Sequence, residues 1–202
     1  MSLPTSPREA HQRLETLSRR LADPATREDA RLELRALADE ARGQPEGAPL
    51  RLVTVQVSLG TAQEKLELLI LPSIFSPEAW AQTFLEGLLK VPLEEYDGRT
   101  LVEVGAGSGW ICIALARFTK LARIHGADLN PQAPAVSWCN AWLNGDEALV
   151  SRLSFSVSDL LRDLKPPQFD FVVGCIPQVL RAEGLPELVT EDDDAQALHD
   201  LS

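Results

Sequence analysis

The sequence predicts an α/β protein whose core is a doubly wound parallel β-sheet. Residues 101–109 join an apolar run directly to alternating glycines, and a helical pattern follows at once. A strand that turns immediately into a helix, with a ligand against its backbone, needs residues without a Cβ. From Arg99 onward, short apolar runs alternate regularly with helical segments. Such alternation implies parallel strands joined by right-handed crossovers.

The elements of this sheet are expected in a fixed order. Strands are predicted at Leu101–Val104, Arg123–Ala127, Leu153–Val157 and Phe169–Val173, and helices at Trp110–Thr119 and Pro131–Asn144. Asn130 is the expected N-cap of the second helix, and Pro131 suits its first position because proline lacks an N–H.

Upstream of the sheet, residues 7–42 predict two short helices from apolar residues at helical spacing. Asp23 and Pro24 should open the second helix, as N-cap and first residue. Two alternating runs, 52–59 and 65–71, predict a β-hairpin, and residues 76–90 predict an amphipathic helix. We therefore expect a helical extension with its linker over residues 1–48 and one α/β domain over residues 49–202.

The amino-acid composition argues against nucleic acids and membranes as binding partners. The 202 residues carry a formal net charge of −11, which argues against a nucleic-acid-binding surface. Seven acids and no Lys or Arg follow Ala182, as expected of a solvated face or a loosely ordered tail. No apolar stretch is long enough for a membrane span, and the N-terminus lacks a signal-peptide pattern. We expect a cytoplasmic protein that binds a small molecule; its oligomeric state is left open.

The three cysteines are widely spaced and do not cluster with the histidines, so no metal site is expected. Cys112 and Cys139 lie in apolar helical segments and are predicted to be small core residues. Cys175 has no base near it in the sequence, so we do not expect it to act as a nucleophile.

The glycine loop carries the strongest functional signal. Its spacing is G-x-G-x-G, with Trp110 standing where the dinucleotide fingerprint G-x-G-x-x-G has its third glycine. Glu103 lies two residues before the first glycine. This pattern resembles motif I of class I S-adenosylmethionine-dependent methyltransferases, and the resemblance implies the doubly wound, Rossmann-like sheet of that class.

An acid at the end of the next strand supports a nucleotide-like cofactor. Asp128 lies about 20 residues after the glycines, where an acid can hold ribose hydroxyls. The alternative, that Asp128 only caps a helix, is weaker because Asn130 is available for that role. Asp159 ends the third strand, and contact with an adenine edge or capping of the next turn fits it equally well.

The segment after the fourth strand bears on the methyl acceptor. It reads Gly174, Cys175, Ile176, Pro177 and Gln178. Many amine methyltransferases carry Asn-Pro-Pro-Tyr or Asp-Pro-Pro-Tyr here, so the missing amide or acid and the missing aromatic disfavour a planar amide or adenine acceptor. The loop also offers no general base. A thioether needs none, because its sulfur carries no proton and catalysis is mainly positioning.

Several segments together resemble the N-terminal methyltransferase region of the methionine S-methyltransferase family. They are residues 21–31, 72–80, the glycine loop, 126–131 and 173–180. The resemblance implies S-adenosylmethionine as cofactor and free L-methionine as acceptor, giving S-methylmethionine. It implies cofactor contacts from Glu103, Gly105, Ala106, Gly107, Gly109, Asp128, Leu129, Asp159 and Gly174, with residues 174–178 facing the acceptor. Residues 76–78 lie where related enzymes carry a segment that folds over the cofactor, and Trp80 either contributes there or belongs to the core.

One departure from this family concerns completeness. Its sheet continues beyond the fourth strand, whereas this chain supplies four strands, which would leave Phe169–Val173 with an unpaired edge. We expect a fragment of a longer enzyme; the alternatives are a missing half supplied by another chain, or a degenerate remnant. The function alternatives are a methyltransferase acting on another small molecule or protein side chain, and a non-catalytic S-adenosylmethionine-binding module.

Overall fold

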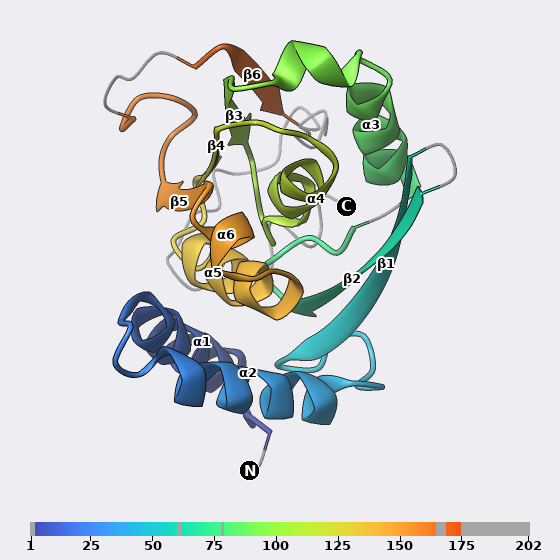
Figure 1. Cartoon of the computed structure of the whole chain (residues 1–202). Coiled ribbons are helices and arrows are strands. Elements are labelled where there is room, and N and C mark those ends of the chain that lie inside the picture. The colour runs from blue at the N-terminus through green and yellow to red at the C-terminus, as the bar shows by residue number, and fades with distance from the viewer. Residues whose placement is uncertain (1–2, 60–61, 78, 165–168, 175–202) are drawn as a thin grey trace, which may run out of the picture.

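The computed structural model describes residues 3–59, 62–77, 79–164 and 169–174. Within them, a four-stranded parallel sheet has the order β5-β4-β3-β6 (Figure 1). Its strands are β3 (Thr100–Val104), β4 (Arg123–Asp128), β5 (Leu153–Val157) and β6 (Phe171–Gly174). The chain runs from β3 through β4 to β5 and then returns to the other side of β3. The predicted doubly wound, Rossmann-like fold is confirmed, and its strand order reverses between β3 and β6, where ligands of such sheets bind.

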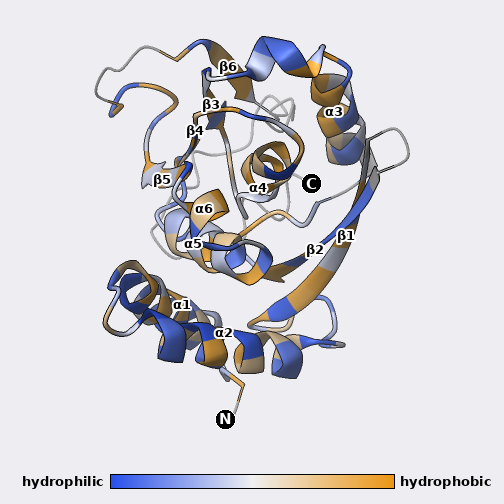
Figure 2. Cartoon of the chain, viewed as in Figure 1, coloured by the Kyte–Doolittle hydropathy of each residue, from blue (hydrophilic) through white to orange (hydrophobic). Residues whose placement is uncertain are grey.

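Two helices cover one face of this sheet. They are α4 (Trp110–Phe118), which follows β3, and α5 (Ala133–Asn144), which follows β4. Figure 2 shows α4 as largely apolar, and its residues from Trp110 to Ala116 are all buried. Trp138 of α5 meets Phe155 of β5 edge-on, with ring centroids 5.2 Å apart. The short helices η1 (Leu93–Tyr96) and α6 (Glu147–Val150) were not predicted.

One row of residues that pair in register across β4, β3 and β6 lies on the sheet face opposite to α4 and α5. Val102 pairs in register with His125 on one side and Val172 on the other. The His125 ring nitrogens lie 2.8 Å from Ser154 Oγ and 2.9 Å from Ser156 Oγ. Val172 is 58 % exposed, so this face is partly open among the described residues.

The helical extension and the hairpin pack against α5. The extension consists of α1 (Pro7–Ala22) and α2 (Arg27–Ala41), which lie below α5 in Figure 1. The hairpin strands β1 (Arg51–Leu59) and β2 (Ala62–Ile70) are antiparallel, and α3 (Ala79–Leu89) follows them. The guanidinium groups of Arg27 and Arg31 lie 5.0 and 5.4 Å from the ring centroid of Trp142, within cation–π range. The division at residue 48 stays a prediction, although both sides of it share one hydrophobic core.

The predicted start of α2 is wrong. The helix begins at Arg27 with Thr26 as N-cap, rather than at Asp23 and Pro24. Asp23 Oδ1 instead accepts a hydrogen bond from Ala25 N at 2.9 Å, and Thr26 N donates to Asp23 O at 3.1 Å. The Asp-Pro pair therefore forms a separate turn between the helices, because Asp side chains stabilise turns as readily as helix starts.

The predicted start of α5 is wrong by a similar margin. Asn130 Oδ1 accepts from Gln132 N at 2.9 Å, and Ala133 N donates to Asn130 O at 3.1 Å. These bonds form a turn, and the regular helix begins only at Ala133. The helix predicted from residue 76 likewise begins at Ala79.

Two further sequence inferences concern burial and membranes. Cys112 and Cys139 are both fully buried free thiols, which confirms their predicted place in the core. None of the described helices is long and apolar enough to cross a bilayer.

The packing of the extension on α5 can be tested with two leucines. Leu14 is fully buried whereas Leu32 is 70 % exposed. We expect Leu14→Ala to lower the free energy of unfolding by about 2–5 kcal/mol, because it leaves a cavity beside α5. Leu32→Ala should change it by less than about 0.5 kcal/mol. Urea denaturation followed by circular dichroism and tryptophan fluorescence measures both. Equal effects of the two substitutions would show that the extension does not pack as described.

Candidate cofactor site

The loop between β3 and α4 brings backbone N–H groups to the carboxyl edge of the sheet. Gly105 N and Ala106 N both donate to Ala127 O, at 2.8 and 3.1 Å, which fastens the start of the loop to β4. Gly107 and Gly109 have φ angles of +52° and +74°, a region that side chains rarely adopt. The glycines therefore let the chain turn from strand to helix within a few residues.

The two glycines differ in what surrounds them. A Cβ on Gly109 would fall 2.8 Å from Ser137 Cβ and 3.1 Å from Phe155 Cε1, so this position is glycine because α5 and β5 pack against it. A Cβ on Gly107 would meet only Ile74 Cγ2, at 3.9 Å. Space beside Gly107 is open, and this is where a ligand can approach the backbone. A cofactor contact of Gly109 stays a prediction.

Asp128 is tied to the same loop. Its Oδ2 accepts from Gly107 N at 2.6 Å, and its Oδ1 accepts from Asn130 N at 2.8 Å. Burial raises the pKa of Asp128, and the N–H groups that it accepts from offset part of this rise. The Leu129 N–H also acts on this carboxylate. A carboxylate has about four acceptor positions, so these contacts leave room for a hydroxyl donor. Asp128 therefore orders the loop, and its predicted ribose contact is compatible with that role.

The segment after β2 closes one side of the site. Asn130 Nδ2 donates to Ser73 O at 2.8 Å, and the Ser73 hydroxyl is hydrogen-bonded to Gln132. Ile74, next in the chain, is the side chain nearest the open space at Gly107. The residues just before 76–78 thus lie beside the glycine loop. Glu78 itself and the Trp80 side chain lie outside what the structure describes.

Glu103 lies beneath the loop rather than on its surface. It is 1 % exposed, and its Oε2 lies 2.9 Å from the Sγ of Cys112 in α4. Burial raises the pKa of Glu103 to about 8; the Cys112 thiol opposes this rise, and the charge of Asp128 adds to it. The carboxyl group is therefore mostly protonated at neutral pH. A direct cofactor contact of Glu103 stays a prediction.

The other predicted site residues are distributed around the same edge. Ala106 is buried within the loop, and Gly174, at the end of β6, pairs in register with Val104 just before it. Asp159 is partly buried, and its Oδ2 lies 2.5 Å from Arg162 Nη1 in a turn. Both roles weighed for Asp159 stay predictions. Cys175, Ile176, Pro177 and Gln178 lie outside the described residues.

Exposed apolar side chains lie at and after the ends of β4 and β5; of these residues only Leu129 is among the predicted cofactor contacts. Leu129, Val157, Leu160 and Leu161 are 69 %, 46 %, 54 % and 42 % exposed. Leu160 also has a φ of +54°, which is strained for a bulky residue. Their signal in the sequence is a leucine directly after β4 and two leucines after Ser158 and Asp159, in segments where polar loop residues are usual. Leu129 follows Asp128 in the chain and Val157 pairs with it in register, so these two exposed residues lie beside the carboxylate.

A groove of about 740 Å³ lies away from this loop, between α2, β2 and the ends of α4 and α5. Two arginines in it are committed to backbone carbonyls. Arg117 holds Asn144 O, and Arg152 holds Ala116 O, Thr119 O and Leu121 O. These contacts satisfy helix C-termini, so we do not assign the cofactor to this groove. In the described part of the chain, no three His, Cys, Asp or Glu side chains gather as metal ligands would.

Comparison with known proteins identifies the family. A family model described as the methyltransferase small domain matches residues 65–182. The chain belongs to the methyltransferase small-domain family. The match includes the glycine loop, Asp128 and β6, which are the elements that form the carboxyl edge described above.

Among individual proteins, the methionine S-methyltransferase of Arabidopsis thaliana is 36 % identical over 216 residues, covering 96 % of this chain and 20 % of that protein. The release factor glutamine methyltransferase of Koribacter versatilis is 30 % identical over 118 residues, covering 58 % of this chain and 40 % of that protein. The chain thus spans a fifth or less of the length of the plant relatives that it matches. A dimethyladenosine transferase structure from Plasmodium falciparum has a TM-score of 0.38 and 16 % identity, covering 52 % of this chain and 33 % of that chain.

The protonated state of Glu103 gives a pH dependence of stability. The pKa of Glu103 rises from 4.5 to about 8 on folding, so the folded protein keeps a proton that the unfolded chain releases between these values. The free energy of unfolding should therefore fall as pH rises from about 5 to about 8. Glu103→Gln should remove this decline, because an amide does not titrate. Urea denaturation at several pH values measures both slopes.

Asp170→Asn is the matched control. Hydrogen bonds from Thr100 lower the pKa of Asp170 below 3.8, so its contribution is complete above that value. The control should therefore keep the wild-type slope. If Glu103→Gln also keeps it, the carboxyl group is ionised in the folded protein.

Proposed function

We propose that this chain binds S-adenosylmethionine and belongs to an enzyme that transfers its methyl group to the thioether sulfur of L-methionine. The observation that carries the cofactor assignment is the open space beside Gly107, whose N–H is fixed by the Asp128 carboxylate. A Cβ would fill this space, which is the cradle that a ligand pressed against the backbone requires.

The residues present fit the cofactor in three places. Asp128 keeps acceptor capacity for a ribose hydroxyl beyond its contacts with backbone N–H groups. Leu129, 69 % exposed, offers an apolar surface for the adenine ring. The open space at the Gly107 backbone allows close approach of the methionine part. When bound, S-adenosylmethionine supplies an electrophilic methyl group.

The acceptor assignment rests on the sequence after β6 and on the relatives. Gly174 ends β6 beside the glycine loop, so residues 174–178 begin at the edge where the cofactor would lie. None of these residues is an acid, histidine or lysine. A thioether attacks through an unprotonated lone pair, so the chain needs to orient the sulfur and exclude water rather than remove a proton. The plant methionine S-methyltransferases support this acceptor.

A protein glutamine amide is the second candidate acceptor, because release factor glutamine methyltransferases are also among the relatives. The segment 174–178 argues against it, since it lacks the Asn-Pro-Pro-Tyr pattern. We also place the protein in the reducing cytoplasm, which suits two buried free thiols.

Two glycines test the cofactor cradle. Gly107 and Gly98 both have positive φ, +52° and +71°, and a Cβ on Gly98 would meet nothing within 4 Å. Valine should therefore introduce a similar backbone strain at each site. We expect Gly107→Val to weaken binding of S-adenosylmethionine by at least about 100-fold, because its branched side chain fills the cradle. Gly98→Val should leave the affinity of the folded protein unchanged. Calorimetry showing equal affinities would contradict the assignment.

A competition assay tests the acceptor. The protein, with any sequence that continues it in its gene, is offered S-adenosylmethionine with L-methionine, a glutamine-containing peptide and adenine nucleotides together. We expect S-methylmethionine by mass spectrometry. At saturating cofactor the rate should be nearly flat through neutral pH, because no catalytic proton transfer shapes it. Methylation of the peptide or of adenine, with methionine untouched, would refute the thioether acceptor, and binding without any transfer would indicate a non-catalytic module.

A further inference from the structure

A line of polar side chains runs along one side of α5. It consists of Ser137, Asn140 and Asn144, which are 1 %, 0 % and 7 % exposed. Their spacing of three and then four residues places them on the same helix face. We call these residues the polar stripe. Buried polar groups are retained only where hydrogen bonds compensate their lost hydration, so the partners of the stripe reveal its purpose.

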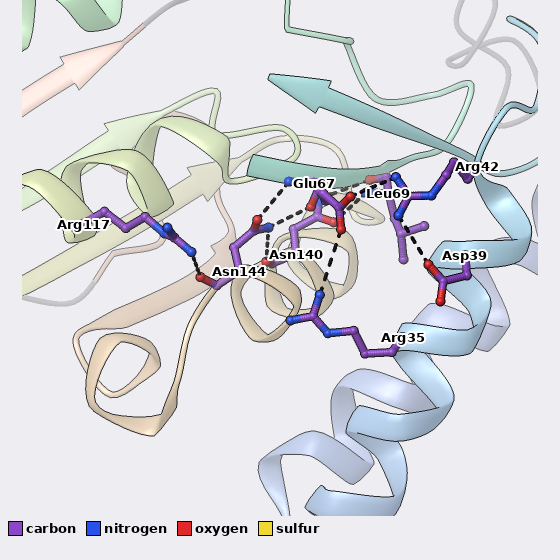
Figure 3. A network of polar contacts seen from close by, with 8 residues as sticks. All are labelled: Arg35, Asp39, Arg42, Glu67, Leu69, Arg117, Asn140 and Asn144. Carbon is purple, nitrogen blue, oxygen red and sulfur yellow. Dashed lines mark hydrogen bonds and ion pairs between the residues drawn. The ribbon is translucent and has the colours of Figure 1, made fainter. Parts of the chain in front are cut away.

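The two asparagines bind the outer edge of β2 (Figure 3). Asn144 Oδ1 accepts from Glu67 N at 2.9 Å, and its Nδ2 donates to Glu67 O at 2.7 Å. Asn140 repeats this arrangement two residues further along the strand. Its Oδ1 accepts from Leu69 N at 2.7 Å, and its Nδ2 donates to Leu69 O at 3.1 Å. The side-chain amides thus take the place of a neighbouring strand.

Asn140 and Ser137 also hold the glycine loop. Asn140 Nδ2 donates to Ser108 O at 3.0 Å, and Ser137 Oγ donates to Gly107 O, also at 3.0 Å. Two consecutive carbonyl oxygens of the loop are therefore held by side chains of α5. Among the described residues, the Asn144 side chain makes no hydrogen bond to this loop; its remaining donor bond goes to Asn140 O, at 2.8 Å.

We propose that Asn140 is a positioning residue of the cofactor site. Through one side-chain amide it fixes the Ser108 carbonyl and the Leu69 backbone at the same time, so the hairpin sets the position of the loop against which the cofactor lies. The cofactor part of this proposal rests on the proposed function. Asn144 makes the same kind of bonds to the same strand without reaching the loop. A comparison of the two asparagines therefore distinguishes positioning of the loop from hydrogen bonding to the edge of β2.

The test compares Asn140→Ala with Asn144→Ala in the full chain. Both variants lose an amide that pairs with β2, so both should speed hydrogen exchange in the peptide covering residues 62–70. Only Asn140→Ala should speed exchange in residues 105–110, measured by mass spectrometry without ligand. It should also weaken S-adenosylmethionine binding about 5- to 10-fold more than Asn144→Ala does, as expected for a lost hydrogen bond. Equal loop exchange and equal affinity in the two variants would overturn the proposal.

Ser137→Ala keeps the test decisive if Asn140→Ala does not fold. It removes only the bond to Gly107 O, so exchange should rise in residues 105–110 and stay unchanged in residues 62–70. Unchanged loop exchange would count against control of the loop by the polar stripe. Binding of S-adenosylmethionine to the wild type is measured by calorimetry, independently of the exchange experiments. If the wild type binds no S-adenosylmethionine, the proposed cofactor fails, while the exchange data still decide whether Asn140 positions the loop.

Discussion

Helix α5 is buried on nearly every side, and this constraint organises the structure. Ten of its residues are buried, and it contacts α1, α2, α4, the hairpin strand β2 and the sheet strands β4 and β5. A helix in such surroundings needs small side chains where neighbours approach, and every polar group on it needs a partner. The close approach of neighbours is shown by Gly109, the N-cap of α4, because a Cβ there would strike Ser137 of α5. The extension, the hairpin and the sheet are thus joined through one helix.

The candidate site combines two carboxyl groups in different states. Asp128 accepts backbone N–H groups from both sides of the site, whereas Glu103 is enclosed between β3 and α4 beside a thiol. Burial raises the pKa of both, and the charge of Asp128 adds to the rise at Glu103. The thiol and backbone of Cys112 oppose the rise at Glu103, and three backbone N–H groups oppose it at Asp128. The glycine loop therefore lies above a largely neutral acid and beside one better suited to carry charge.

The sequence predicted those features that depend on local pattern. The glycine spacing, the four strands and the buried cysteines followed from periodicity and from residues without a Cβ. The helix starts at residues 23 and 130 were mispredicted, because Asp and Asn stabilise turns by the same bonds that cap helices. The roles of Asn140 and Asn144 depend on β2, which lies more than 70 residues away in the chain. Their signal was present as two asparagines four residues apart in an apolar helix, but only the tertiary structure shows what they bind.

The row of hydrogen bonds between α5 and β2 can extend over only a short length. Four helical residues rise about 6.0 Å, and two strand residues advance about 6.4–6.8 Å, so the two repeats nearly coincide over a single step. Each further step would add roughly half an ångström of misfit, and an extended row of such contacts could not stay in register. Amyloid growth requires a free strand edge to which further strands can add. A helix that carries asparagines can therefore cover a short stretch of such an edge without offering a new edge for further strands. The helix step and the strand step cannot stay matched over a longer distance, so the β1-β2 sheet ends at α5.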